Sequence, residues 1–433
     1  GRRSLYLLGT IIFTIGSFLC ATATSMEQLI IYRGLQGIGG GMIMPLSQTI
    51  IGDIFSAEQR AKWQGVFGAL FGLSSVIGPF LGGLIVDHIS WHWIFLINVP
   101  TGLLSAILIY VGLKHEAIRK TEKVNIDYLG IFTLIPGIVL LLLGLTFGGD
   151  KFEWLSLESI LIFGSTIVFI VLFIIFERRA AEPILDLSLF KNRVFSTTNI
   201  LGFLLGLGMF GAIMFVPLFM QGVLGVPPTK AGSTMTPMMI GMILSSIIGG
   251  RLLLKFRFRT VLIFGMAIAT LGFFLMSMMD GSTTIFTAYS FMAILGIGMG
   301  LVMPTLMIAV QNEFPKSQLG SVTAASTFYP SIGGTMGITI LNAVMNHNLQ
   351  QNMDDAVVSQ KDPILHEALK ALPDKTDTLF NIMLYPENLK MPAEVSNVPV
   401  QTIENAWIDA FSSVFITGIF FVSAGILVAL SVG

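Results

Sequence analysis

Apolar residues gather in twelve runs along the chain, most of them about twenty residues long and separated by polar segments. A helix of about 20 apolar residues crosses a lipid core of about 30 Å. Backbone groups in lipid find no water to bond, so these runs are predicted to be helices. The pattern therefore predicts an all-α, polytopic membrane protein. The expected spans are 5–21, 29–51, 63–86, 94–112, 129–147, 160–176, 199–220, 231–253, 261–279, 286–310, 322–344 and 407–432.

Composition strengthens this prediction and narrows the chemistry. Of the 433 residues, 54% are hydrophobic and only 11% are charged, whereas soluble domains carry about 25% charged residues. The single cysteine, Cys20, excludes a disulfide within the chain and a Cys-rich metal site. The sequence shows no nucleophile–base pair, metal cluster or nucleotide-binding loop. We therefore expect neither an enzyme nor an ATP-driven pump, and no cofactor, metal or nucleic-acid partner.

The basic residues predict the orientation in the membrane. Most of the 24 Lys and Arg residues fall in alternate loops, and short loops rich in Lys and Arg face the cytoplasm. The chain is then a multi-pass protein of the plasma or inner membrane. Residues 346–405 become one long external loop, within which 362–370 has the pattern of a short amphipathic helix lying on the outer surface.

The chain also repeats itself. Residues 37–45 read GIGGGMIMP and residues 296–304 read GIGMGLVMP, at an offset of 259 residues. Two transporter halves related by an axis along the membrane normal leave such a trace. Four further matches lie just upstream at an offset of 256 residues: Arg3 with Arg259, Gly9 with Gly265, Thr14 with Thr270, and Gly16 with Gly272.

The repeat predicts how the chain divides. Residues 1–126 form an N-terminal bundle, 127–196 a linking transmembrane hairpin with a cytoplasmic loop, and 197–433 a C-terminal bundle that carries the long external loop. The two spans within 199–253 have no counterpart in the first bundle. We therefore expect a chain that lacks its first two helices, with twelve spans present of fourteen.

Four segments in the first quarter of the chain carry motifs of a known family. Residues 1–3 resemble the end of the loop motif G-x-L-x-D-R-x-G-R-K/R, and residues 33–39 are similar to R-x-x-Q-G-x-G. Residues 72–83 resemble the antiporter motif G-x(5)-G-P-x-x-G-G, and residues 91–102 the stretch W-R-W-x-F-x-x-N-x-P-x-G. The chain therefore resembles the major facilitator superfamily and, within it, the fourteen-helix drug:proton antiporters.

This resemblance implies two six-helix bundles, a linking helix pair, and export of drugs driven by proton entry. The bundles would rock around a midplane cavity. The expected partners are a small-molecule substrate, protons and the lipid bilayer, and we expect a monomer.

Arg33 is the basic residue that the loops leave over, and it lies about one turn inside predicted span 29–51. A charge at bilayer depth costs several kcal/mol, roughly, and marks a functional position by default. The resemblance implies that Arg33 takes part in proton transfer by favouring the charged form of a nearby carboxylate. Gln36 lies three residues on, on the same helix face, and would share that site. A snorkelling or purely structural arginine, about one turn in from Glu27, remains the alternative.

The antiporter-like segment is rich in glycine. Small residues at near-helical spacing let two helices approach closely, and proline bends a helix. Tight packing is one interpretation, and the resemblance implies another, a hinge that seals the path against proton leak. The residues concerned are Gly72, Gly78, Pro79, Gly82 and Gly83.

A cytoplasmic gate is a further hypothesis. One span leads out from the first arginines and the next returns near Asp53, so a charge pair there would latch the inward side shut. An ordinary surface pair, worth about 0–1 kcal/mol, remains open. Under the repeat, Glu313 lies within one residue of the Asp53 equivalent. The expected gate residues are Arg2, Arg3, Asp53, Glu313 and either Arg257 or Arg259.

Methionines mark a candidate substrate path on the first two spans of the second half. Methionine is soft and polarizable and suits promiscuous binding. Lipid-facing filler explains these methionines equally well. The candidates are Met209, Met214, Met238 and Met242.

The acidic residues are placed differently. All 25 Asp and Glu residues fall in loops or near span ends, yet a proton antiporter needs a carboxylate that is loaded and unloaded. The resemblance implies that this residue lies in the first helix, which we expect to be absent. The predicted function is export of hydrophobic, often cationic, compounds in exchange for protons. A facilitator of another small solute, or a truncated membrane protein that does not transport, remains the alternative.

Overall fold

The structure is a computed structural model that describes most of the chain. It describes residues 2–432 except 56–58, 60–62, 64–65, 68–69, 71–72, 75–76, 79–80, 83, 87, 114–126, 149–151, 153, 181–182, 316–317 and 361–399. The helices are α1 (Arg2–Ala21), α2 (Met26–Ile54), α4 (His92–Leu96), α5 (Asn98–Gly112), α6 (Tyr128–Phe147), α7 (Leu157–Glu177), η1 (Leu187–Lys191), α8 (Arg193–Gly222), α9 (Pro228–Gly232), α10 (Met235–Leu252), α11 (Phe258–Met276), α12 (Ile285–Glu313), α13 (Leu319–Gln360) and α16 (Val400–Ala429).

The prediction of an all-α membrane protein is confirmed. Nine helical segments among the described residues are long and apolar enough to cross a membrane. Expected spans 29–51 and 322–344 lie inside two further helices, α2 and α13. Several residues of expected span 63–86 lie outside the described part of the chain.

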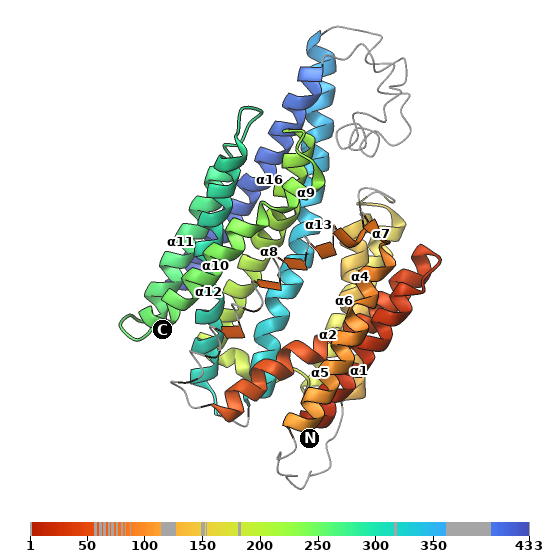
Figure 1. Ribbon diagram of the computed structural model, residues 1–433, viewed down its shortest axis with the longest axis vertical. Coiled ribbons are helices and arrows are strands. Elements are labelled where there is room, and N and C mark those ends of the chain that lie inside the picture. Colours follow the sequence, from red (N-terminus) through yellow and green to blue (C-terminus); the bar gives the residue numbers. More distant parts are fainter. Residues whose placement is uncertain are drawn as a thin grey trace.

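The helices form two groups joined by a hairpin (Figure 1). Helix α1 packs against α2, α4 and α5, and we name these the first helix group. Helices α8, α10, α11, α12, α13 and α16 pack against one another as the second helix group. The linking hairpin, α6 and α7, lies between them in sequence. Helix α13 contacts both α2 and α6, so it carries the described contact between the two groups.

Two expected spans are each broken into two helices. Span 94–112 divides into α4 and α5 at Ile97. Pro100 lies in the first turn of α5 and has no N–H to donate to the Leu96 carbonyl four residues earlier, which explains the break. Span 231–253 likewise begins with the short helix α9 before α10.

Both ends of the expected external loop are helical. Helix α13 continues to Gln360 and α16 begins at Val400, although 346–405 was expected to be loop. Residues 346–360 are polar but contain no glycine or proline. The apolar pattern shows only where lipid contact ends, and residues 346–360 contain nothing that stops a helix. Helices α13 and α16 project together beyond the other helices (Figure 1). The expected amphipathic helix at 362–370 lies outside the described residues.

Glycine sets the distance between α1 and α2. A Cβ atom placed on Gly39 would come within 2.7 Å of the carbonyl oxygen of Gly9 and would collide with the backbone nitrogen of Phe13. Atoms that close cannot coexist, so α2 approaches the α1 backbone only because position 39 has no side chain.

The second helix group repeats this contact between α11 and α12. A Cβ atom on Gly298 would come within 2.7 Å of the carbonyl oxygen of Gly265 and would collide with the backbone nitrogen of Ala269. Gly298 is the repeat partner of Gly39, and Gly265 is the repeat partner of Gly9. The sequence repeat therefore corresponds to a repeated helix pair.

The core of the second helix group is formed around α8. Helix α8 buries Phe215 and Phe219 completely, and the Phe219 ring meets the ring of Phe411 on α16 edge to face at 5.5 Å. Trp407 of α16 is also fully buried. Aromatic pairs of this geometry add about 0.5–1.5 kcal/mol beyond the area that they bury. This core holds α8 and α16 together, and α13 packs against both of them and contacts α2.

Candidate functional site

Arg33 and Gln36 lie together on α2, as the sequence predicts. Nη1 of Arg33 donates a 2.7 Å hydrogen bond to Oε1 of Gln36. The guanidinium carbon of Arg33 lies 5.8 Å from the centre of the Phe95 ring on α4, which places the cation over an aromatic face. Gln36 is buried and Arg33 is exposed. The cation is therefore held by an amide and a ring.

A buried thiol completes the Gln36 contacts. The Sγ atom of Cys20, which has no exposed surface, donates to Oε1 of Gln36 at 3.8 Å. Helix α1 reaches Gln36 because a Cβ atom on Gly16 would come within 2.6 Å of the Gln36 backbone. Gly16 thus brings α1 close enough for Cys20 and Arg33 to share one acceptor.

A second polar chain lies beside this one and fixes the broken span. Oγ of Ser17 donates to the carbonyl oxygen of Phe95 at 2.9 Å, and Nδ2 of Asn98 donates to Oγ of Ser17 at 3.1 Å. Ser17 is fully buried. These bonds tie α1 to the junction of α4 and α5, so they hold the Phe95 ring beside Arg33.

Sequence reasoning missed Ser17 and Cys20 and included Asn98 only as part of a motif. A signal was present, because polar residues recur at helical spacing within the apolar span 5–21. Thr10, Thr14, Ser17 and Cys20 follow one another at four or three residues. That spacing places them on one face of α1.

The first two expected gate residues, Arg2 and Arg3, have described contacts on α2 and α5. Nη1 of Arg2 donates to the carbonyl oxygen of Thr49 at 3.5 Å, one turn before Asp53. The guanidinium carbon of Arg3 lies 4.4 Å from the centre of the Tyr110 ring. The side chain of Asp53 lies outside the described part, so its pairing with either arginine stays a prediction.

Glu313 has a different described partner from the one expected. Its Oε1 accepts a hydrogen bond from Nδ2 of Asn192 at 3.1 Å, while Oδ1 of Asn192 caps α8 by accepting from the Phe195 amide. Arg259 lies in the first turn of α11. Glu313 thus ties the end of α12 to the start of α8.

The antiporter-like segment is described only in part. Gly72, Pro79 and Gly83 lie outside the described residues, whereas Gly78 and Gly82 are helical. A Cβ atom on Gly78 or Gly82 would meet no described atom within 4 Å. Both interpretations of this segment, packing and hinge, stay predictions.

The four methionines have different surroundings. Met238 is fully buried in the core of the second helix group, and Met209 and Met242 pack against that core. Met214 is 40% exposed. Met238 therefore contributes to packing, and a role of the four methionines in a substrate path stays a prediction.

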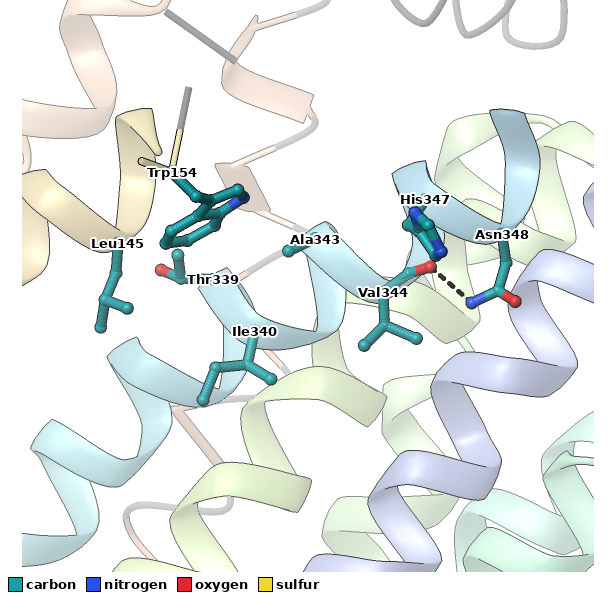
Figure 2. Close-up of a pocket in the computed structure, with 8 residues that line it drawn as sticks. All are labelled: Leu145, Trp154, Thr339, Ile340, Ala343, Val344, His347 and Asn348. Carbon is teal, nitrogen blue, oxygen red and sulfur yellow. Dashed lines mark hydrogen bonds between the residues drawn. The ribbon is translucent and has the colours of Figure 1, made fainter. Parts of the chain in front are cut away.

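A cavity of about 410 Å³ lies between the hairpin and α13 (Figure 2). Leu145 and Trp154 form its hairpin side, at the end that the charge pattern places outside. The α13 side combines three polar residues, Thr339, His347 and Asn348, with the apolar residues Ile340, Ala343 and Val344. Nδ2 of Asn348 donates to the Val344 carbonyl at 2.8 Å, which leaves Oδ1 as an acceptor. Figure 2 shows Trp154 beside α13, with His347 and Asn348 further along the helix.

Metal chemistry has no candidate site in the part of the chain that the structure describes. No group of three or more His, Cys, Asp or Glu side chains lies close enough there to hold a metal ion.

The fold and its buried polar contacts define a class of protein, the multi-pass membrane transporters built from two repeated helix groups. The family model of the Major Facilitator Superfamily matches residues 1–338. The chain belongs to this superfamily, as its motifs predict, and it is a transporter of small-molecule substrates in the plasma membrane.

Curated relatives extend this result. The chain is 47% identical over 433 residues to the multidrug transporter protein MdtP of Bacillus subtilis, covering 98% of this chain and 80% of the relative. It is 39% identical over 413 residues to multidrug resistance protein 3 of the same organism, covering 95% of this chain and 78% of the relative.

Solved structures share the fold. The human organic anion transporter MFSD10 aligns with a TM-score of 0.57 at 15% identity, covering 98% of this chain and 77% of that one. The proton:xylose symporter XylE aligns with a TM-score of 0.53 at 14% identity, covering 98% and 80%. Identities this low show the fold alone.

Proposed function

We propose that the chain exports hydrophobic, often cationic, drugs in exchange for protons by alternating access. The observation that supports proton coupling most directly is the placement of Arg33. Its guanidinium has five N–H donors, and among the described residues Gln36 is the acceptor that it meets. The remaining donors can hold a carboxylate that releases its proton, because a nearby cation favours the charged form.

Relatives named for multidrug transport and resistance support the substrate class. The cavity beside Trp154 supports it chemically. Its walls suit a flat apolar molecule, and the polar tips of His347 and Asn348 would orient a polar group at one end. The indole ring of Trp154 attracts a cation through its face. We infer that this cavity is an outer station on the drug path.

Alternating access needs two helix groups that move against each other. Helix α13 is the element of the second group that contacts α2 of the first and α6 of the hairpin. The bonds from Arg2 to Thr49 and from Asn192 to Glu313 each lie within one group. They therefore stiffen each group, and the α2–α13 contact is where rocking would occur.

The test is dye flux by the full chain in inside-out vesicles under an imposed pH gradient. We expect accumulation of a fluorescent lipophilic cation that collapses when the gradient is removed and that Arg33→Ala abolishes. Arg251→Ala, at the exposed end of α10, is the matched control and should retain flux. A folded, inserted protein that moves no cation, or an Arg33→Ala variant that moves dye at the original rate, contradicts the proposal. Flux of another solute would point to the alternative substrate class.

A further inference from the structure

Two carboxyl groups meet at one end of the linking hairpin. Asp127 caps the N-terminus of α6, where its Oδ1 accepts from the Gly130 amide at 2.9 Å. Glu177 is the last residue of α7, and its Oε1 accepts a hydrogen bond from the amide of Leu185. The two side chains approach each other beside one segment: Asp127 lies over Gly130 against the side chain of Ile184, and Glu177 holds the amide of the next residue, Leu185.

The other oxygen of each carboxyl is buried. Oδ2 of Asp127 and Oε2 of Glu177 have no exposed surface and no hydrogen-bond donor among the described residues. Glu177 is only 3% exposed. Asp127 is folded over Gly130, since a Cβ atom there would collide with Oδ2 of Asp127 and lie 2.9 Å from the side chain of Ile184. Water is therefore kept from the pair by its own surroundings.

Two ionised carboxylates cannot occupy this place without a donor between them. Like charges at hydrogen-bond distance in apolar surroundings repel strongly, and carboxyl pairs so placed retain one proton between them. With one proton, the protonated carboxyl donates to the other and both buried oxygens are satisfied.

Cations could neutralise the pair instead, so the charged groups of each neighbouring element matter. Arg178 and Arg179 follow α7 and are exposed, and the Tyr128 side chain on α6 is exposed as well. Asp186, in the turn that follows, accepts from the Ser188 amide. None of these groups forms an ion pair or hydrogen bond with the two carboxyls in the described part of the chain. A shared proton would satisfy both buried oxygens.

We propose that Asp127 and Glu177 form a proton-binding site that holds one shared proton. The bound proton joins the two ends of the hairpin, and through the Leu185 amide it also joins them to the segment that leads into α8. Loss of the proton places two negative charges side by side and separates these ends. The site is distinct from Arg33 and does not depend on drug transport.

The test is infrared spectroscopy of the purified full chain in detergent across a pH series, together with its melting temperature. We expect a carbonyl band of a buried, protonated carboxylic acid that exchanges slowly in heavy water. The band should be lost in Glu177→Gln and in Asp127→Asn. Asparagine caps helices as well as aspartate does, so the second variant keeps the α6 cap. Glu158→Gln, an exposed position on the same α7 helix, is the matched control and should keep the band.

The sign of the pH effect follows from the shared proton. The folded state binds a proton that the unfolded chain releases more readily, so the stabilisation is present at low pH and is lost as pH rises. Melting temperature should therefore fall as the band disappears. Glu177→Gln carries an amide that always donates, so its melting temperature should lose this dependence. Absence of the band from the native protein at every pH, or a band that survives both variants, overturns the proposal.

Discussion

Oε1 of Gln36 accepts a 2.7 Å hydrogen bond from Nη1 of Arg33, and the thiol of Cys20 shares the same acceptor. A buried amide thus orients a cation that would otherwise reach for the membrane surface. Gln36 fixes where the free donors of Arg33 point, so it sets the direction from which an anion can approach.

Arg33→Lys should impair proton-driven flux although it keeps the charge. Lysine has no planar fork, so it cannot both donate to Gln36 and lie flat over Phe95. A hydrogen bond to a charged group is worth about 1.5–3 kcal/mol, so initial dye uptake should fall by about tenfold or more. Rates in inside-out vesicles measure this, with Arg251→Lys as control. Unchanged rates in Arg33→Lys would show that charge alone suffices.

Gly39→Ala should destabilise the protein. Its methyl group would collide with the α1 backbone, and forcing extra atoms into a packed contact costs about 1–3 kcal/mol. Gly41→Ala is the control, because a Cβ atom there meets nothing within 4 Å. Alanine at position 41 should instead stabilise the helix by about 0.5–1 kcal/mol. Opposite shifts in melting temperature are expected; equal shifts would refute the close approach.

Ser17→Ala and Asn98→Ala should be less costly together than the sum of the two alone. Each single change leaves a partner unsatisfied at about 1–3 kcal/mol, whereas the double change removes both sides of the Asn98–Ser17 bond. A double-mutant cycle on melting free energies should give a coupling of about 0.5–3 kcal/mol. Thr22→Ala, at an exposed position on the same chain segment, should couple to neither.

Trp154→Ala should weaken drug binding at the outer station. Loss of an aromatic contact costs about 0.5–1.5 kcal/mol beyond area, which raises Kd by about two- to tenfold. Fluorescence titration of a lipophilic cation without a pH gradient measures Kd. Trp93→Ala, which removes a half-exposed tryptophan at a different helix, serves as control. Equal effects of the two substitutions would assign the binding elsewhere.

The turn between α11 and α12 should respond to acid. Hydrogen bonds from the hydroxyl and amide of Ser282 hold the pKa of Asp280 below its usual range. A depressed folded-state pKa means that these bonds stabilise the turn above the unfolded value of about 3.9 and are lost as pH falls below it. Ser282→Ala should raise the pKa of Asp280 toward the ordinary value, which carboxyl NMR shifts across a pH titration would show. An unchanged titration midpoint would mean that the hydrogen bonds from backbone amides alone lower the pKa of Asp280.

The apolar pattern of the sequence predicts most of the helices but not their ends, because a helix can continue beyond the part that contacts lipid. Apolar runs locate the spans because lipid contact demands them. Helix α13 continues to Gln360 because residues 346–360 contain no glycine or proline that would end it. Pro100 predicts a break in span 94–112, but the continuous apolar pattern of that span hides it, and the structure shows the break.

In the candidate site, contacts within one helix could be predicted from the sequence, whereas contacts between helices could not. Arg33 and Gln36 are neighbours on one helix, so spacing alone predicts their contact. The bond from Asn98 to Ser17 joins residues far apart in sequence, and it depends on how α1 and α5 are rotated about their axes. Glycines 39 and 78 look alike in sequence, yet only packing distinguishes a glycine at a helix crossing from one with no described neighbour.

The repeated glycine crossings have a mechanical consequence. Where α1 meets α2, and again where α11 meets α12, backbone lies on backbone with no side chain between them. A side chain can yield by changing rotamer, but a peptide plane cannot. Each pair should therefore behave as a single lever arm. Movement in this molecule should therefore occur at contacts between side chains. A conformational change should leave both helix pairs intact and alter the contacts that α2 and α12 make with α13.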